Sequence, residues 1–384
     1  MKTYSDIISF IKNTFQQNEN AIPLHEPFFG GNEKEYVLDC INSTFVSSIG
    51  SYVSKFEEEL ANYCKCAEAV AVVNGTSALH AALHVVGVKA NDEVLTQAFT
   101  FVATANAIKY CGAKPIFVDV DIDTMGMSAS SLKIFLELNA EIREGKCINK
   151  NTGNKIAACM PMHTYGFPVN IEEICEICEN WGIPVIEDAA EALGSKYKGK
   201  ALGTFGDLGV LSFNGNKIIT SGGGGAILTN NLKYAQEIKH ITTTAKVPHP
   251  YEFHHDQLGF NYRMPNLNAA LLCAQLEQID QFLLNKRELA ERYKSYFDKI
   301  GVKFKWEKNH CEANFWLMCI QLESLEERNS FIEACISAGI MARPSWQLMY
   351  TLPAFKDCIR DDQKNAKFLQ KRIVNIPSSY RSIH

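Results

Sequence analysis

The sequence predicts an α/β protein with a mostly parallel sheet in a large domain and a smaller α+β domain towards the C-terminus. Short apolar strands alternate with amphipathic helices between residues 70 and 188, which is the pattern of a parallel sheet with crossover helices. A long helical pattern from 267 to 300 leads away from that region. Beyond it, a strand-like segment at 315–322 precedes a helix-like one at 325–338, which predicts a mixed second domain.

The individual elements follow in chain order. Residues 4–15 place their apolar side chains on one helix face, so we expect residues 1–20 to form an N-terminal docking helix. The large domain is predicted to span residues 21–265, and the long helix with the small domain residues 266–384. Seven apolar runs predict the strands of the sheet: 69–73, 93–95, 115–118, 157–162, 184–187, 208–213 and 225–228.

Composition favours a folded globular chain. The 384 residues are 46% hydrophobic and 21% charged, which is enough apolar material for one large core and a smaller second one. A formal net charge of -5 provides no general basic field, so we expect no nucleic-acid partner. No apolar run reaches the roughly 18 residues of a membrane span, and no basic segment leads into a signal core. We therefore expect no membrane association and a cytoplasmic location.

The 13 cysteines are scattered through apolar patterns, and we interpret them as reduced. Two pairs, Cys64 with Cys66 and Cys175 with Cys178, suggest a metal site. Neither pair has a second pair or a His cluster near it at zinc-finger spacing, so small buried hydrophobic residues are the favoured explanation. We predict no metal site.

Several polar or aromatic segments lie where a strand ends or a helix begins, which is where open α/β sheets hold ligands. Gly75, Thr76 and Ser77 open a helix after strand 69–73, so N–H groups and hydroxyls there could hold a phosphate. A plain helix cap is the alternative. Asp188 and Glu191 follow strand 184–187, where acids could bind a metal, orient a base or pair with a protonated ring nitrogen.

Lys217 follows strand 208–213 and precedes apolar and glycine residues, which is unusual for a surface lysine. Burial would favour the neutral amine that forms imines, whereas the alternative is a lysine that extends from a turn into solvent. The glycines at 222–225 lead into a strand, so they do not predict a dinucleotide loop. Phe101 could lie against a flat ring or could belong to the core.

Together these segments supply a phosphate-binding turn, an acid for a ring nitrogen, an aromatic side chain for a ring face and a lysine for an aldehyde. Pyridoxal phosphate (PLP) carries all four of the matching groups. The residues therefore predict PLP as the cofactor.

Five motifs resemble one family. In chain order they are NGTSALHAAL from Asn74, TFVATANAI from Thr100, EDAAEALGS from Glu187, SFNGNKIIT from Ser212 and LGFNYRMPNLNAA from Leu258. Over nearly the whole chain they resemble the DegT/DnrJ/EryC1/StrS sugar aminotransferases, which implies the aspartate aminotransferase-like PLP fold type I. SFNGNKIIT is most similar to the branch that aminates C4 of 4-keto-6-deoxy-2-acetamido sugars on the bacillosamine and legionaminic acid routes. The N-terminal helix is similar to the LegC type.

The resemblance implies a role for each motif residue. Lys217 would link to PLP and shuttle a proton, and Asp188 would face the pyridine nitrogen. Glu191, where relatives usually carry Gln or His, would face the phenolic oxygen. Asn261 and Arg263 would reach the phosphate side from the other subunit of a homodimer. The other implied cofactor contacts are Gly75, Thr76, Ser77, Phe101 and Ser212.

The resemblance further implies that the amino group passes from L-glutamate to a nucleotide-linked keto-sugar, with UDP preferred. Lys217 stands where similar dehydratases carry His, so deoxygenation at C3 is not expected. His163 could instead be a core histidine, and Arg343 could pair with a surface acid. The expected substrate contacts are Asn32, Ser48, His163 and Tyr165 for the sugar, and Arg343 and Trp346 for the diphosphate or base.

Three alternatives remain open from the sequence. Amination at C3 and amination of a GDP-linked 4-keto-6-deoxyhexose, as in perosamine synthesis, would use the same cofactor motifs. A regulatory protein with this fold and no turnover is the alternative outside enzymes. The presence of Lys217, Asp188, Glu191 and Ser212 together favours the enzyme.

Overall fold

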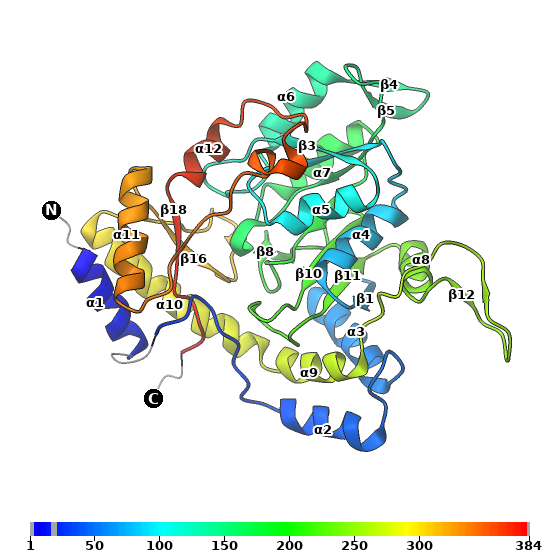
Figure 1. Cartoon of the computed structure of the whole chain (residues 1–384), viewed down its shortest axis with the longest axis horizontal. Helices are drawn as coiled ribbons and strands as arrows, with labels where there is room; N and C mark the ends of the chain where they lie inside the picture. The colour runs from blue at the N-terminus through cyan, green and yellow to red at the C-terminus, as the bar shows by residue number, and fades with distance from the viewer. Residues whose placement is uncertain (1–3, 17–20, 382–384) are drawn as a thin grey trace.

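Two sets of strands join into one central sheet in the computed structural model, which describes residues 4–16 and 21–381 (Figure 1). Parallel bridges from Cys159 to Val185 and from Met162 to Asp188 connect the two sets. The strand order is β3 (Lys114–Val118), β2 (Glu93–Gln97), β6 (Ile156–Met160), β7 (Ile186–Asp188), β10 (Leu208–Ser212), β11 (Gly225–Thr229) and β1 (Glu68–Val72).

Only β11 runs against its neighbours in this sheet. It pairs antiparallel with β1 and β10, whereas β10 with β7 and β2 with both β3 and β6 are parallel. The predicted mostly parallel α/β sheet is thus confirmed. All strands except β11 therefore end at the same edge, called here the carboxyl edge of the sheet.

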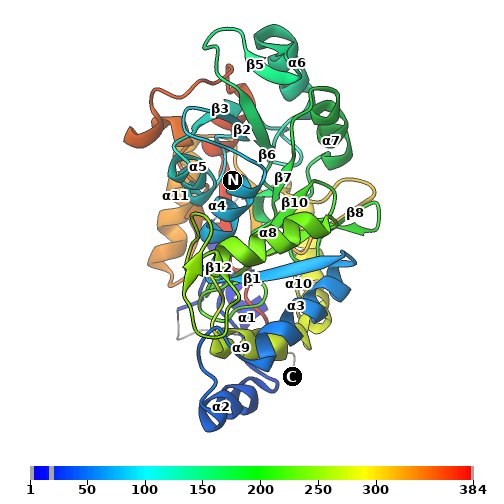
Figure 2. The same ribbon diagram turned by 90° about the vertical axis from the view of Figure 1, so that its right-hand side faces the viewer.

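Helices cover both faces of the sheet because side chains alternate along each strand (Figure 2). In β1, Val70 and Val72 belong to one apolar core, and Ala69 and Ala71 to the other. The first core contains residues of α4 (Gly75–Val85), α5 (Val102–Tyr110) and α8 (Leu232–Thr242). The second contains residues of α3 (Ser51–Cys64), α6 (Ala129–Asn139) and α7 (Ile171–Asn180).

The long helix predicted for 267–300 is two helices, α9 (Asn266–Leu276) and α10 (Ile279–Ile300), so that prediction was wrong in detail. Neither Pro nor Gly marks the break. The amide groups of Gln275 and Gln278 both donate to Glu33 Oε1, at 2.6 and 2.8 Å, and this polar contact lies where the helical path is interrupted.

A second, antiparallel sheet follows these helices. Its order is β14 (Lys303–Phe304), β16 (Met318–Gln321), β18 (Ile373–Ile376) and β17 (Arg343–Pro344), and α11 (Leu325–Ser337) packs beside it. The strand and helix predicted for 315–322 and 325–338 correspond to β16 and α11. The domain boundary between 265 and 266 remains a prediction.

The N-terminal helix α1 (Tyr4–Phe15) lies beside α10 and α11 (Figure 1). Tyr4 meets Phe331 edge-on at 5.5 Å between ring centroids, and Phe10 stacks on Tyr296 at 3.7 Å. These contacts agree with a docking helix. Residues 1–3 and 17–20 of the predicted segment lie outside the described residues.

The remaining elements surround these layers. Helix α2 and helix α3 were not predicted from the sequence. Across residues 4–16 and 21–381, no helix combines the length and the apolar character needed to cross a membrane. The other elements are α2 (Glu33–Ser43), β4 (Ala140–Arg143), β5 (Lys146–Asn149), β8 (Lys196–Tyr197), β9 (Lys200–Ala201), β12 (Lys246–Val247), β13 (His254–His255), β15 (Cys311–Glu312), α12 (Lys364–Gln370) and short 3-10 turns at Thr164–Gly166, Met349–Thr351 and Pro353–Phe355.

Candidate active site

A cavity of about 770 Å³ lies at the carboxyl edge of the central sheet and is also lined by residues in and next to the second sheet. The segments after β1, β2, β6, β7 and β10 all reach it, because the parallel strands deliver their ends to one place. Its polar and aromatic lining includes Asn74, Gly75, Thr76, Phe101, Thr104, Tyr165, Asp188, Glu191, Ser212, Asn214, Asn216, Lys217, Trp316, Arg343, Trp346 and Asn375.

The amine of Lys217 lies inside this cavity, between a carboxylate and an aromatic ring. Its Nζ is 3.3 Å from Glu191 Oε1 and 3.8 Å from the centroid of the Trp316 ring. The Lys217 side chain is 13% exposed and that of Glu191 only 2%. Burial raises the pKa of Glu191 to about 7, although the nearby Lys217 lowers it. Glu191 can therefore exchange a proton near neutral pH.

Asp188 is a buried carboxylate on the same side of the cavity. Its Oδ2 accepts a hydrogen bond from Thr104 Oγ1 at 2.7 Å, and its Oδ1 accepts one from the backbone N–H of Ala190 at 3.2 Å. Burial raises the pKa of Asp188, which means that the charged form lacks full compensation. Asp188 forms no ion pair with any residue in the described part of the chain. A positively charged ring N–H would supply the missing partner.

The turn between β1 and α4 is the segment that was predicted to bind a phosphate. Asn74 Oδ1 accepts from the Ser77 N–H at 2.7 Å and caps the helix, and the first-turn N–H groups of Gly75 and Thr76 have no intrahelical acceptor. A Cβ atom on Gly75 would lie 2.9 Å from Ser212 Cβ, so glycine keeps this space open. Gly75, Thr76 and Ser212 line the cavity, whereas Ser77 lies behind them and does not.

These residues fit PLP. The amine of Lys217 suits an aldehyde, the incompletely compensated carboxylate of Asp188 suits a ring nitrogen, and the helix N-terminus beside Ser212 suits a phosphate. Phe101 lines the cavity and is 50% exposed, so its ring is available to a flat ligand.

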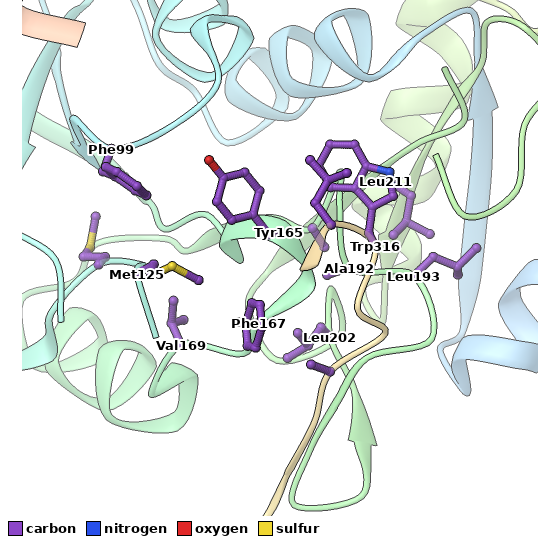
Figure 3. Close-up of a cluster of buried hydrophobic side chains, with 14 of the residues drawn as sticks. Phe99, Met125, Tyr165, Phe167, Val169, Ala192, Leu193, Leu202, Leu211 and Trp316 are labelled. Carbon is purple, nitrogen blue, oxygen red and sulfur yellow. The ribbon is translucent and has the colours of Figure 1, made fainter. Parts of the chain in front are cut away.

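Three predicted substrate residues also line the cavity: Tyr165, Arg343 and Trp346. Tyr165 has a left-handed backbone (φ 56°), and its ring lies 4.7 Å from that of Trp346. Its hydroxyl is buried, and burial raises the pKa of Tyr165 well above its ordinary value. Figure 3 shows Tyr165 and Trp316 along one side of a buried apolar cluster that also contains Phe167.

Three other predicted substrate residues do not line the cavity. Asn32 donates to Glu277 Oε2 at 2.9 Å on the surface, and Ser48 is exposed in the loop before α3. His163 is fully buried; its Nδ1 accepts from the Val169 N–H at 3.3 Å, so Nε2 donates to Glu187 at 3.0 Å. These contacts agree with the alternative of a core histidine. In this chain alone, none of the three is placed to touch a ligand in the cavity.

Asn261 and Arg263 also lie outside the cavity of their own chain. Asn261 bridges to Thr243, and Arg263 is 3.5 Å from Glu57 Oε1. That they serve a second subunit stays a prediction.

Several cavity residues were missed by the sequence reasoning. Thr104 belongs to the motif TFVATANAI and lies one helical turn after Phe101, so this spacing could have predicted that it faces the same cavity. Asn375 lies on β18 of the second sheet and Trp316 on the segment just before β16, and no local pattern marks them. Leu24, on the segment that leads into the large domain, also contributes.

A carboxyl edge that presents a lysine, a buried aspartate and a helix N-terminus suited to a phosphate is the arrangement expected of a PLP-dependent enzyme. The model of the DegT/DnrJ/EryC1/StrS aminotransferase family matches residues 28–382. The chain belongs to this family and is a PLP-dependent sugar aminotransferase.

Individual relatives agree with this assignment. The chain is 39% identical over 359 residues to the GDP-perosamine synthase of Escherichia coli O157:H7, covering 93% of each chain. It is 30% identical over 334 residues to the UDP-4-amino-4,6-dideoxy-N-acetyl-beta-L-altrosamine transaminase of Campylobacter jejuni 81-176, covering 85% of each. The solved PLP form of Spr1654 from Streptococcus pneumoniae has the same fold, with a TM-score of 0.83, 24% identity and 93% of each chain covered.

Proposed function

We propose that this enzyme transfers an amino group from L-glutamate to C4 of a nucleotide-linked 4-keto-6-deoxy sugar. The observation that supports the chemistry most directly is Lys217 Nζ, 3.3 Å from Glu191 in a cavity that also contains Asp188. A buried amine, a proton-exchanging acid and an incompletely compensated carboxylate are the groups that amino transfer requires.

Each residue has a defined task in this proposal. Bound PLP supplies the aldehyde that accepts the amino group and the ring that takes up electrons. Asp188, held by Thr104, keeps a proton on the ring nitrogen. Lys217 moves a proton to and from the carbon that bears the amino group, and Glu191 holds the Lys217 amine ready between transfers. Gly75, Thr76 and Ser212 hold the phosphate, and Phe101 covers the ring.

The sugar nucleotide is the finer part of the proposal. The GDP-perosamine synthase of Escherichia coli is 39% identical to the chain, and the altrosamine transaminase of Campylobacter jejuni 30%. This favours a GDP-linked 4-keto-6-deoxyhexose over the UDP-linked 2-acetamido sugar preferred from the motifs. The UDP-linked sugar remains the second candidate because of the SFNGNKIIT resemblance and the Campylobacter relative.

We further propose a homodimer in which Asn261 and Arg263 complete the partner's phosphate site. Mixing Lys217→Ala with Arg263→Ala subunits tests this arrangement. If each site uses both subunits, a mixed dimer contains one intact site, so two inactive preparations should recover up to about a quarter of wild-type activity after subunit exchange. No recovery despite proven exchange would contradict shared sites and leave the chemistry at Lys217 unaffected.

The central experiment combines purified enzyme, PLP and L-glutamate with GDP- and UDP-linked 4-keto-6-deoxy sugars, and identifies the amino sugar by mass spectrometry and NMR. Lys217→Ala should remain folded, lack the yellow colour of lysine-linked PLP and show no turnover. Lys371→Ala, which changes an exposed lysine outside the cavity, is the matched control. Full turnover by Lys217→Ala would refute the proposal.

A further inference from the structure

The amine of Lys217 has two neighbours of different kinds, and only one is an acid. Glu191 Oε1 lies 3.3 Å from Nζ, while the indole of Trp316, on the segment just before β16, places its ring centroid 3.8 Å from the same nitrogen. We propose that Trp316 is a positioning residue for Lys217, and that its ring face holds the amine beside Glu191 and favours the positively charged state. This inference rests on the proposed role of Lys217.

Trp316 contacts Lys217 at its amine and also holds the backbone next to it. Its Nε1 donates to the carbonyl oxygen of Asn216 at 2.5 Å, and Asn216 immediately precedes Lys217. The same side chain thus holds the backbone at the base of Lys217 and covers the amine at its tip. Trp316 is 4% exposed, so the ring has little freedom to leave this position.

The backbone of Trp316 is anchored as well. Its N–H donates to Asn314 Oδ1 at 2.8 Å, and its carbonyl oxygen accepts from Lys286 Nζ at 3.1 Å and from Ser378 Oγ at 3.0 Å. These partners come from three separate segments. Such a network holds one orientation of the ring, because any rotation of the peptide would break several buried hydrogen bonds at once.

Asn314 links the ring to the acid on the other side of the amine. Its Nδ2 donates to the carbonyl oxygens of Glu191 and Leu193, at 2.9 Å each, while its Oδ1 holds Trp316. One amide group therefore sets the spacing between Glu191 and Trp316. The space between them is occupied by the amine of Lys217.

This placement has a chemical consequence. The face of an indole ring attracts an ammonium group and has little attraction for a neutral amine. The ring therefore stabilises the positive charge on the lysine nitrogen and keeps a released amine close to the reacting carbon. The other titratable groups that interact with Lys217 are Asp188 and His25, and burial lowers the pKa of His25 well below its ordinary value.

The first test is spectroscopic. In the PLP-loaded enzyme, the absorbance of the lysine-linked cofactor is followed against pH for wild type, Trp316→Leu and Trp316→Phe. Loss of the ring should lower the midpoint of this titration by about 0.4 to 1.5 pH units, and Phe, which keeps a weaker ring and most of the volume, should lower it less. A purely structural role of Trp316 would not move the midpoint in this graded way.

The second test uses the cofactor-free protein. Acetylation of Lys217 by acetic anhydride is measured by peptide mass spectrometry as a function of pH, and its midpoint should fall over the same range in the same order of variants. Trp306→Leu is the control, since Trp306 packs against Phe315 at 5.0 Å and does not line the cavity. Unchanged or higher midpoints in both Trp316 variants, or an equal shift in Trp306→Leu, would overturn the inference.

The two proposals can fail separately. If Lys217→Ala keeps the colour and the turnover, the proposed function is wrong, yet the acetylation midpoint still reports whether Trp316 acts on the Lys217 amine. If the midpoints do not move while Lys217→Ala is inactive, the function stands and the role of Trp316 is wrong.

Discussion

Glu191 provides the sharpest quantitative prediction because its environment changes the energy of its charged form. Its carboxylate is buried, with Oε1 facing Lys217 and Oε2 accepting from the Tyr165 N–H at 2.9 Å. Burial raises its pKa from the ordinary 4.5 to about 7. Glu191→Gln preserves the shape of the side chain, can still accept from Tyr165, and removes the titration.

Proton linkage gives the direction in which the stability contributed by Glu191 changes with pH. Because the pKa of Glu191 is higher in the folded than in the unfolded protein, the stability that it contributes is fully present below pH 4.5 and is lost as the pH rises through about 7. The difference between the two pKa values corresponds to about 3 kcal/mol. The unfolding free energy of Glu191→Gln, relative to wild type, should therefore rise by about this amount between pH 4.5 and 7.5.

Urea unfolding of the cofactor-free proteins, followed by circular dichroism at several pH values, measures this difference. Glu33→Gln is the matched control. Burial alone would raise the pKa of Glu33, but hydrogen bonds to its carboxylate, including those from Gln275 and Gln278, lower it. Its contribution is present above the unfolded pKa of about 4.5 and is lost as the pH falls through the lower folded pKa. The difference curve of the control should therefore be nearly flat above pH 4.5 and should slope the opposite way below it.

A flat difference curve between pH 4.5 and 7.5 for Glu191→Gln would refute the reasoning. It would mean that Glu191 stays charged throughout that range and is fully compensated by Lys217. The offset between the two proteins at any single pH is not diagnostic, because the amide also changes the contact with Lys217. Only the slope isolates the titration of the carboxylate.

Two further predictions concern the support of the site. Gly166→Ala should lower stability by about 2 to 4 kcal/mol, because φ is +89° and the new Cβ would lie 1.9 Å from Asn314 Oδ1. Gly153→Ala is the control, because φ is +73° but the space around it is open, and it should lower stability by only about 1 to 2 kcal/mol. Equal losses of stability in the two variants, measured by thermal unfolding, would contradict the proposed clash at Gly166. Thr104→Val should lower the unfolding free energy by about 1.5 to 3 kcal/mol and weaken PLP binding, because Asp188 loses a hydrogen-bond donor at 2.7 Å. Thr104→Ser keeps the hydroxyl, so it should retain both the stability and the PLP affinity. Wild-type PLP affinity in Thr104→Val, measured by fluorescence titration, would count against the role of that hydroxyl.

The sequence was sufficient to predict the central sheet and the position, at its edge, of the residues that we expect to bind the cofactor. Each motif follows an apolar run, and strands β7 and β10 are parallel neighbours with Val210 opposite Asp188. Their ends therefore bring Asp188 and Lys217 to one cavity, as strand ends in open parallel sheets do. Here local pattern and global topology agree, and for that reason the prediction succeeded.

Residues that arrive from distant segments could not be predicted in this way. Trp316 and Asn375 reach the cavity only because the second sheet packs over the carboxyl edge, and no periodicity marks that packing. The break between α9 and α10 was missed for a similar reason, since it depends on contacts from Gln275 and Gln278 to Glu33, which lies about 240 positions earlier in the chain. Local propensity carries no information about such partners.

The same distinction explains why a motif that is most similar to one branch of the family does not decide the nucleotide. In the segment SFNGNKIIT, Ser212, Asn214, Asn216 and Lys217 line the cavity beside Asp188 and Glu191. The last three residues, Ile218, Ile219 and Thr220, are buried in the core. These side chains therefore either line the part of the cavity that contains Asp188 and Glu191 or pack in the core next to it. The resemblance of this segment therefore concerns the amino-transfer step, which is the same whichever nucleotide the sugar carries. Similarity over the whole chain is the better guide to the nucleotide.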